Sequence, residues 1–485
     1  MSRSSRFHRH VGSTLAVALL VALPVAAQDD DADAPTTVLD QIEQMREQLD
    51  DVQQENARLR TEVDDLRAVN DDDWLTEQRA EEIRGLVADV LADADTRSSL
   101  LQDGLVAGWS DHFFLASPDG RFKLQIDGMI QFRWIFNYRD APDAFRNGFE
   151  VTRTRLTFRG HVFSPAMTYL VRLQHTRDET GLVSGLYFMR DAWIRYQFNN
   201  SLGVRVGRFQ LPFSREELTS PAYQQGVERT LVNDNLGMGR SDAIELILSG
   251  ETLKFMGTWD DGAEDRLGNV GLTGITPGVT GFAALIEDVE WSFTGRVEWK
   301  PAGNWEQFKQ FTSPVGGDFG LLFGIGLHAQ NGESTGAFTL GRDETDWYAY
   351  TVDGQVQFGG ANIYASWFQH YLDTPTLNIN VLGFTIQGAI YLAPKWEIFA
   401  RWQWGQWDIS GTLQRSDLNV VSAGFNYYID GHDIKWSTDI GFGIGQVEDV
   451  WAQDIAGTGG IGGWRIDPEG AEPQIVFRTQ IQLLF

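Results

Sequence analysis

The sequence predicts an all-β transmembrane barrel of about sixteen antiparallel strands, preceded by an α-helical coiled coil. Three observations lead to this prediction. Apolar and polar residues alternate from residue 121 to the last residue, residues 42–70 carry a heptad pattern, and no segment after residue 27 is apolar for long enough to cross a bilayer as a helix. A chain that lies in a membrane without such helices must close into a barrel, because lipid satisfies no unpaired backbone groups.

The 485 residues divide into three predicted parts. Residues 1–27 are expected to be a signal peptide, with basic residues first, an uncharged apolar run over residues 11–25 and a small-residue cleavage site before Gln28. The run is too short for a transmembrane anchor. Residues 28–111 are expected to form an acidic helical stalk in the periplasm, and residues 112–485 to form the barrel.

The charge of the chain is concentrated in the predicted stalk. The formal net charge is −28, and residues 28–111 hold 24 acidic and 7 basic residues. This balance excludes nucleic acid as a partner, since phosphate binding needs a basic face. The chain has no cysteine, so burial or a closed hydrogen-bonded sheet must supply its stability without disulfides.

A heptad pattern predicts the coiled coil. Its two seam positions are occupied by Ile42, Leu49, Asn56, Val63 and Asn70, and by Met45, Val52, Leu59 and Leu66. The two asparagines are expected to set register or oligomeric state. A single amphipathic helix packed on the barrel is the alternative. A second helix is expected over residues 76–95, after the acidic stop at residues 71–73.

From residue 121 the period changes to two, which is typical of a strand with one face on lipid and one on water. Sixteen strands are predicted, starting near residues 121, 148, 166, 187, 201, 241, 252, 290, 318, 346, 361, 380, 395, 418, 433 and 474. Tight turns alternate with long connections, as in membrane barrels. The segment 301–317 is the exception, because it is long where a short turn is expected.

Aromatic residues are expected to mark the membrane interfaces. The interpretation places in these girdles Trp299, Trp396, Trp404, Trp407, Tyr427 and Tyr428, with core packing as the alternative. The last strand alternates up to Phe485, and a terminal aromatic of this kind resembles the signal that directs barrels into the outer membrane.

The alternation predicts a set of arginines that face the lumen: Arg153, Arg155, Arg159, Arg172, Arg195 and Arg205. Stacked lumenal arginines favour the passage of anions. Alternatively, they pair with inward carboxylates such as Asp127 and Asp191. The long connection 211–240 is expected either to fold into the lumen and narrow it or to form a surface lid; its charged candidates are Arg215, Glu216, Glu217, Glu228, Arg229, Asp234 and Arg240.

No motif indicates catalysis. The sequence shows no Ser/His/Asp motif in a usable context, no phosphate-binding loop and no zinc spacing. We therefore expect no enzyme activity, no cofactor and no metal.

Three segments together resemble the phosphate-selective porin O/P family. They are RTRLTFRGHVF at 153–163, the stretch 190–229 that contains GRFQLPFSREE at 207–217, and FRTQIQLLF at 477–485. The resemblance covers about residues 120–485 and implies a sixteen-stranded, usually trimeric diffusion porin. Selective members use inward arginines and a lysine cluster at the constriction, but segment 211–240 contains no lysine.

The function expected from these features is passive diffusion of small hydrophilic solutes through an outer-membrane porin, with mild anion selectivity of the phosphate type. The alternative is a structural barrel that tethers a coiled coil to the cell wall. The expected partners are outer-membrane lipid, two further copies in a homotrimer, small hydrophilic or anionic solutes, and peptidoglycan through the stalk.

Overall fold

The structure is a computed structural model that separates the chain into two units, residues 1–96 and 97–485. The residues it describes are 38–71, 105–110, 112–141, 144–175, 187–263, 288–334, 343–373, 378–410, 415–452, 461–467 and 473–485. The predicted signal peptide and the predicted helix over residues 76–95 lie outside these ranges.

The first unit contains one described helix, α1 (Val38–Asp71). The helix covers the whole heptad segment. The seam residues Leu49, Val52, Leu59 and Val63 are exposed. In the described parts of the chain, no helix is long and apolar enough to cross a membrane. The helical half of the coiled-coil prediction is therefore confirmed, and its pairing with other helices stays a prediction.

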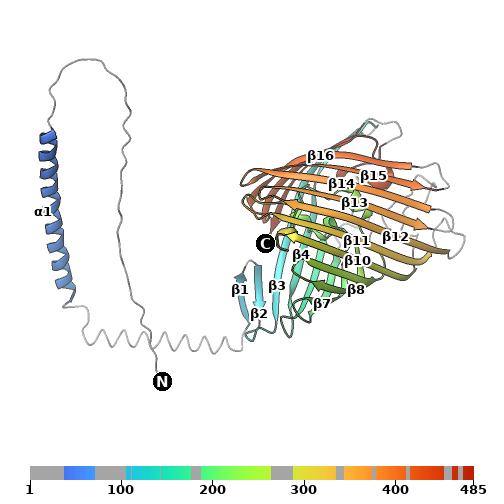
Figure 1. Cartoon of the computed structure of the whole chain (residues 1–485), viewed down its shortest axis with the longest axis horizontal. Helices are drawn as coiled ribbons and strands as arrows, with labels where there is room; N and C mark the ends of the chain where they lie inside the picture. The colour runs from blue at the N-terminus through green and yellow to red at the C-terminus, as the bar shows by residue number, and fades with distance from the viewer. Residues whose placement is uncertain are drawn as a thin grey trace, which may run out of the picture. The chain divides into compact units, whose positions relative to one another are not determined.

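Sixteen antiparallel strands form the closed barrel of the second unit, in chain order around the wall (Figure 1). They are β3 (Lys123–Tyr138), β4 (Phe145–His161), β5 (Met167–His175), β6 (Tyr187–Gln197), β7 (Leu202–Gln210), β8 (Arg240–Ser249), β9 (Leu253–Asp260), β10 (Asp288–Ala302), β11 (Gly320–Ser334), β12 (Asp343–Gln357), β13 (Ala361–Asp373), β14 (Asn378–Ala393), β15 (Trp396–Ile409), β16 (Arg415–Asp430), β17 (Ile434–Gly443) and β18 (Ile475–Leu484). β18 closes the ring by pairing with β3, from Leu484 opposite Met129 to Ile475 opposite Tyr138.

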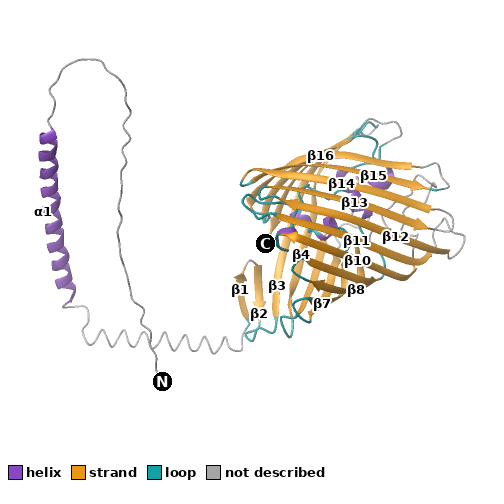
Figure 2. Cartoon of the chain, in the orientation of Figure 1, coloured by secondary structure: helices purple, strands orange, loops and turns teal. Residues whose placement is uncertain are grey.

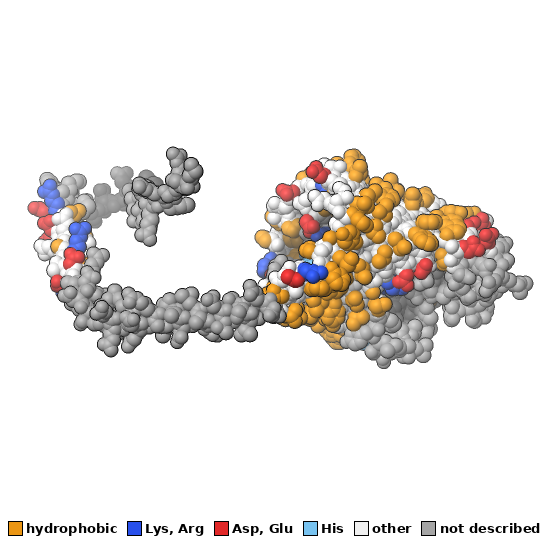
Figure 3. All heavy atoms as spheres, turned by 90° about the horizontal axis from the view of Figure 1, so that it is seen from below, with side chains coloured by type: hydrophobic (Ala, Val, Ile, Leu, Met, Phe, Trp, Pro, Cys, Tyr) orange, Lys and Arg blue, Asp and Glu red, His pale blue; other side chains and the backbone are white. Residues whose placement is uncertain are grey.

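The predicted barrel is confirmed in strand number and in position, since each strand begins within three residues of its predicted start. The strand positions agree because apolar and polar residues alternate along each strand as the barrel requires. In β18 the inward residues Val476, Arg478, Gln480 and Gln482 are buried, whereas the outward Ile481 and Leu483 are exposed. Hydrophobic side chains gather on the outer surface of the strands (Figure 3), as lipid contact requires.

A hairpin that was not predicted precedes the barrel. β1 (Val106–Ser110) pairs with β2 (His112–Ala116), and β2 pairs with the start of β3, from Phe113 opposite Ile126 to Ala116 opposite Lys123. β18 ends before this part of β3, so the hairpin occupies the edge that β18 leaves open. β1 lies inside the segment that was assigned to the stalk.

The predicted aromatic girdle needs one correction. Trp299 and Trp396 are exposed on the outer face, but Trp407 and Tyr428 are buried and point into the lumen. Their positions in β15 and β16 have inward parity, and Trp407 packs edge-on against Trp451 at 6.3 Å. For these two residues the alternative, core packing, is correct.

Candidate functional site in the barrel lumen

The connection between β7 and β8 lies inside the barrel. It contains α3 (Arg215–Leu218), η1 (Pro221–Tyr223) and α4 (Leu231–Leu236), and nearly all of residues 211–239 are buried; helical segments are visible within the barrel in Figure 2. Side-chain N-caps stabilise the first turns of α3 and α4. Glu217 N donates to Ser214 Oγ (3.2 Å) and Asn233 N donates to Thr230 Oγ1 (3.0 Å), which satisfies free N–H groups at each helix start.

Hydrogen bonds anchor this lumen loop, residues 211–239, to distant parts of the wall. Arg296 on β10 donates to Phe213 O (2.8 Å), and Leu231 N donates to Gln403 Oε1 on β15 (2.7 Å). Further anchors reach β16, β17 and β18 through Asn426, Asp439, Lys435 and Gln482. The loop therefore crosses the lumen from β7–β8 to the opposite wall.

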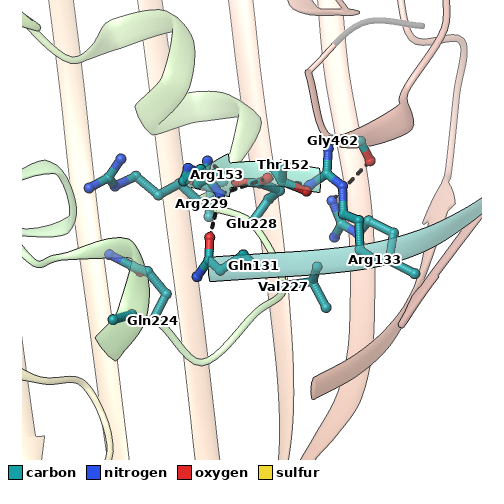
Figure 4. Close-up of polar contacts among 12 residues, drawn as sticks. Gln131, Arg133, Thr152, Arg153, Gln224, Val227, Glu228, Arg229 and Gly462 are labelled. Atoms are coloured by element: carbon teal, nitrogen blue, oxygen red, sulfur yellow. Dashed lines mark hydrogen bonds and ion pairs between the residues drawn. The ribbon is translucent and has the colours of Figure 1, made fainter. Parts of the chain in front are cut away.

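Glu228 ties the loop to the first two barrel strands. Its carboxylate pairs with Arg153 on β4 (2.6 Å) and with Arg133 on β3, as Figure 4 shows. Burial by itself would raise the pKa of the Glu228 carboxyl, but Arg153 and Arg133 outweigh burial and hold the pKa below its usual range. Glu228 is thus charged, and it neutralises part of the two guanidinium groups.

An apolar core fills the other side of the lumen. Loop residues Phe213, Leu231, Val232, Leu236 and Met238 pack against inward residues of β12–β16. The segment between β17 and β18 adds Trp451 and Trp464, and Asn235 donates to Trp451 O (3.1 Å). Each such apolar side chain contributes about 1.5–3 kcal/mol on burial. This packing fills the lumen beside β12–β16 with apolar side chains.

The six wall candidates all lie on inward positions of β4–β7, but they differ in their partners. Four pair with carboxylates: Arg153 with Glu228 (2.6 Å), Arg159 with Asp127 (2.7 Å), Arg172 with Asp191 (3.0 Å) and Arg205 with Glu245 (2.8 Å). Arg155 donates to Gln174 (2.6 Å) and Arg195 donates to Gln197 (2.6 Å). Ion pairs, one of the two predicted arrangements, therefore hold four of the six arginines, and neutral glutamines hold the other two; an anion path stays a prediction.

The charged loop candidates mostly hold the loop together. Arg215 donates to Gln355 (2.6 Å) and to Phe308 O, and Arg229 donates to the carbonyls of Glu216, Glu217 and Thr219. Glu216 accepts from Thr230 N (2.7 Å), and burial raises the pKa of its carboxyl. Glu217 accepts from Gly239 N (3.1 Å), and Arg240 pairs with Asp191 (3.0 Å).

Arg190 is a lumenal arginine that is not among the six predicted from the sequence. In β6 the register shifts so that Asp191 faces Arg172 and Met189 faces Leu173, which makes Arg190 the extra residue of a β-bulge. The positive charges of Arg153 and Arg240 lie close enough to repel both Arg190 and Arg155. Within the described ranges, no ion pair joins Arg155 or Arg190 to a carboxylate. The adjacent charges of Arg190 and Asp191 break the alternation and could have indicated the bulge.

Solvent reaches several arginines of β4–β7, and it reaches the paired arginines of β10 and β18 far less. The side chains of Arg159, Arg172 and Arg205 are 40%, 29% and 20% exposed. On β10 and β18, Arg296 and Arg478 are 0% and 2% exposed and pair with Asp353 and Asp439. The accessible part of the lumen therefore runs along β4–β7. Within the described residues, no three His, Cys, Asp or Glu side chains form a cluster that could hold a metal ion.

A closed sixteen-stranded barrel with a loop folded across its lumen defines the architecture of an outer-membrane channel. The model of the phosphate-selective porin O and P family matches residues 128–266, which confirms the resemblance over that segment. This segment includes all six wall candidates and the lumen loop.

Three further proteins are similar to the chain. An uncharacterized protein of Aquifex aeolicus (strain VF5) is 25% identical over 265 residues, which are 52% of this chain and 62% of that protein, so the match spans under two thirds of the relative. The outer membrane channel DcaP of Acinetobacter baumannii has a TM-score of 0.50 at 12% identity and covers 78% of this chain and 100% of its own. Salmonella typhi OmpF in complex with daunomycin has a TM-score of 0.49 at 12% identity, with the same two coverages. The likeness to DcaP supports the fold alone.

Proposed function

We propose that the chain is a passive porin of the outer membrane that passes small hydrophilic solutes with a mild preference for anions. The observation that carries the proposal is the accessible arginine wall. Arg155, which is 6% exposed, and Arg190 form no ion pair within the described residues, and they add positive charge next to Arg172, which solvent reaches. A lumenal wall of this sign attracts anions at close range, whereas charges on the outer surface are screened beyond about 8 Å.

The proposal does not extend to a specific phosphate site. The lumen loop contains no lysine, its arginines bind backbone carbonyls and a wall glutamine, and Arg240 at the start of β8 pairs with Asp191. Only the field of the wall is then available to select solutes, and a field discriminates by charge sign more than by chemical identity. No enzymatic role is proposed.

We further propose a homotrimer surrounded by outer-membrane lipid, with the short-turn end of the barrel in the periplasm, as in other membrane barrels. The α1 segment would then lie in the periplasm as a stalk, with peptidoglycan as a candidate partner. The alternative role, an anchor for the stalk, accounts for α1 but gives no reason for an accessible wall of arginines.

Reversal potential under a KCl gradient in a planar bilayer tests the selectivity. The wild-type channel should prefer chloride mildly, and the double variant Arg155→Gln with Arg190→Gln should shift the reversal potential toward cation preference without closing the pore. Arg121→Gln is the matched control, because Arg121 is exposed in the turn before β3 and outside the lumen. A cation-selective wild type, or a double variant with the potential of the control, would show that the wall does not set selectivity.

A further inference from the structure

We infer that segment 303–319, the connection between β10 and β11, forms a second constriction at the short-turn end of the channel and is coupled to the lumen loop. The inference rests on the proposed porin function. The other short-side connections are brief turns of the wall, and this one contains η2 (Gln307–Lys309) and four buried residues, Phe308, Phe311, Thr312 and Ser313. Phe308 and Phe311 are 4% and 0% exposed, although they lie between two strands at a solvent-facing rim.

The backbone directs this segment inward. Gly303 and Gly316, near its two ends, have φ angles of +87° and +78°, which residues with a Cβ rarely adopt. These left-handed positions let the chain leave β10, enter the barrel and return to β11. The exposed Val315 and Phe319 mark the return to the rim.

Contacts with the wall show how far the segment reaches. Gln355 on β12 donates to Phe311 O (3.1 Å), and the ring of Phe311 lies 4.8 Å from that of Tyr364 on β13. Beyond these strands, Gln310 Oε1 lies 2.7 Å from His432 Nε2 in the turn between β16 and β17. That turn is six strands away from β10–β11 around a ring of sixteen. The segment therefore crosses most of the width of the mouth.

Two charged groups couple the segment to the lumen loop. Glu397 on β15 accepts from Thr312 Oγ1 (2.7 Å) and from Gln225 Nε2 of the loop (3.2 Å) through the same carboxylate oxygen. Arg215 of the loop donates to Phe308 O, and its guanidinium lies 5.6 and 5.5 Å from the ring centres of Phe308 and Phe311. A displacement of either element removes partners from a buried charge, which is costly. The two elements are thus expected to hold each other in place across the pore.

The consequence for transport is a channel that is narrowed twice along its axis, by the lumen loop and then by segment 303–319. The exposed charges of the segment include Lys309 and Glu306, which pair with each other (2.6 Å), so the second constriction limits the size of solutes and leaves selection by charge to the arginine wall. Removal of the segment should widen the path and leave charge preference nearly unchanged.

The test uses the full chain in planar bilayers and in liposomes. One variant replaces residues 303–320 by Asn-Gly, a two-residue hairpin that joins the paired residues Ala302 and Leu321. Single-channel conductance in KCl should rise roughly twofold, because ionic conductance grows with the open cross-section at the narrowest point. The largest neutral sugar that enters liposomes should also become larger.

A second variant, Phe308→Ser with Phe311→Ser, keeps the segment at full length and removes its buried contacts. Its conductance should increase or fluctuate between levels, whereas Val315→Ser, a control at an exposed position of the same segment, should behave as the wild type. Heat-dependent mobility on gels checks that each barrel is folded.

The outcomes separate this inference from the proposed function. If the wild type conducts and both variants, correctly folded, match its conductance and sugar limit, the segment is wall reinforcement and the inference is overturned. If the wild type is closed and the variants conduct, the segment is a plug and the inference stands, while passive diffusion through the native chain fails. If none of the folded proteins conducts, both proposals are lost.

Discussion

Lumenal arginines have two environments in this protein, which differ in the partner of the guanidinium group. Arg296 is fully buried and donates two hydrogen bonds to Asp353 (2.7 and 2.8 Å), and Arg478 makes the same paired contact with Asp439 (2.7 and 2.9 Å). Such pairs offset the desolvation of both charges only when every partner is in place. Arg155 is also buried (6% exposed), but its partner is the neutral Gln174, so its charge is not paired with a carboxylate in the described residues.

Asp353→Asn should destabilise the folded barrel by about 3 kcal/mol, because the buried Arg296 guanidinium loses its paired contact with Asp353 and keeps only Glu298 (3.0 Å). Asp242→Asn is the matched control: Asp242 is 61% exposed and its contact with Arg208 is long (3.8 Å), so its loss should cost at most about 1 kcal/mol. Denaturant unfolding in detergent micelles measures both. Equal losses in the two variants would contradict the distinction between the buried and the exposed pair.

At the scale of elements, α1 and the lumen loop differ in whether their apolar side chains are buried. The loop buries its apolar residues inside the barrel, whereas the seam residues of α1 are exposed in a single chain. An apolar stripe on a long, otherwise polar helix is stabilised by pairing with other helices. Asn56 lies in this stripe and donates to Val52 O (2.9 Å), a bond that an exposed amide makes within its own helix.

Replacing Asn56 by Leu should change the association of α1, because the seam loses its central polar residue, which limits the partners and registers it accepts. A peptide of residues 38–71 is expected to sediment as a larger or less uniform oligomer when it carries Asn56→Leu. Gln54→Leu, on the outer side of the predicted seam, should leave the mass unchanged. Peptides that stay monomeric with either residue would exclude a coiled coil formed by α1.

At the scale of the whole molecule, the barrel is complete without the stalk. β18 pairs directly with β3, so every strand from β3 to β18 has two neighbours, and the lumen contacts described above all lie within the second unit. A closed sheet has no free edge from which unfolding or aggregation could begin. Transport should therefore depend on the barrel, and any attachment to the cell wall should depend on α1.

Deleting residues 36–70 should accordingly leave single-channel conductance and reversal potential at wild-type values. A peptidoglycan pull-down with the same deletion should lose any binding that the full chain shows. A truncated protein that inserts into bilayers as folded barrels but no longer conducts would show that the two units are functionally coupled.

The sequence by itself determined the number of strands, their positions and the face of nearly every residue. The reason is that apolar and polar residues alternate within each strand, since one face meets lipid and the other meets the lumen. Prediction from this alternation failed at the bulge at Arg190 and at the inward residues Trp407 and Tyr428. Only the tertiary structure decided which arginines are neutralised, where the lumen loop and segment 303–319 lie, and that β1 and β2 extend the sheet. Pairs such as Arg153–Glu228 and Thr312–Glu397 join residues 75 and 85 positions apart across the lumen. No local pattern encodes such contacts, because they exist only once the barrel has closed around them.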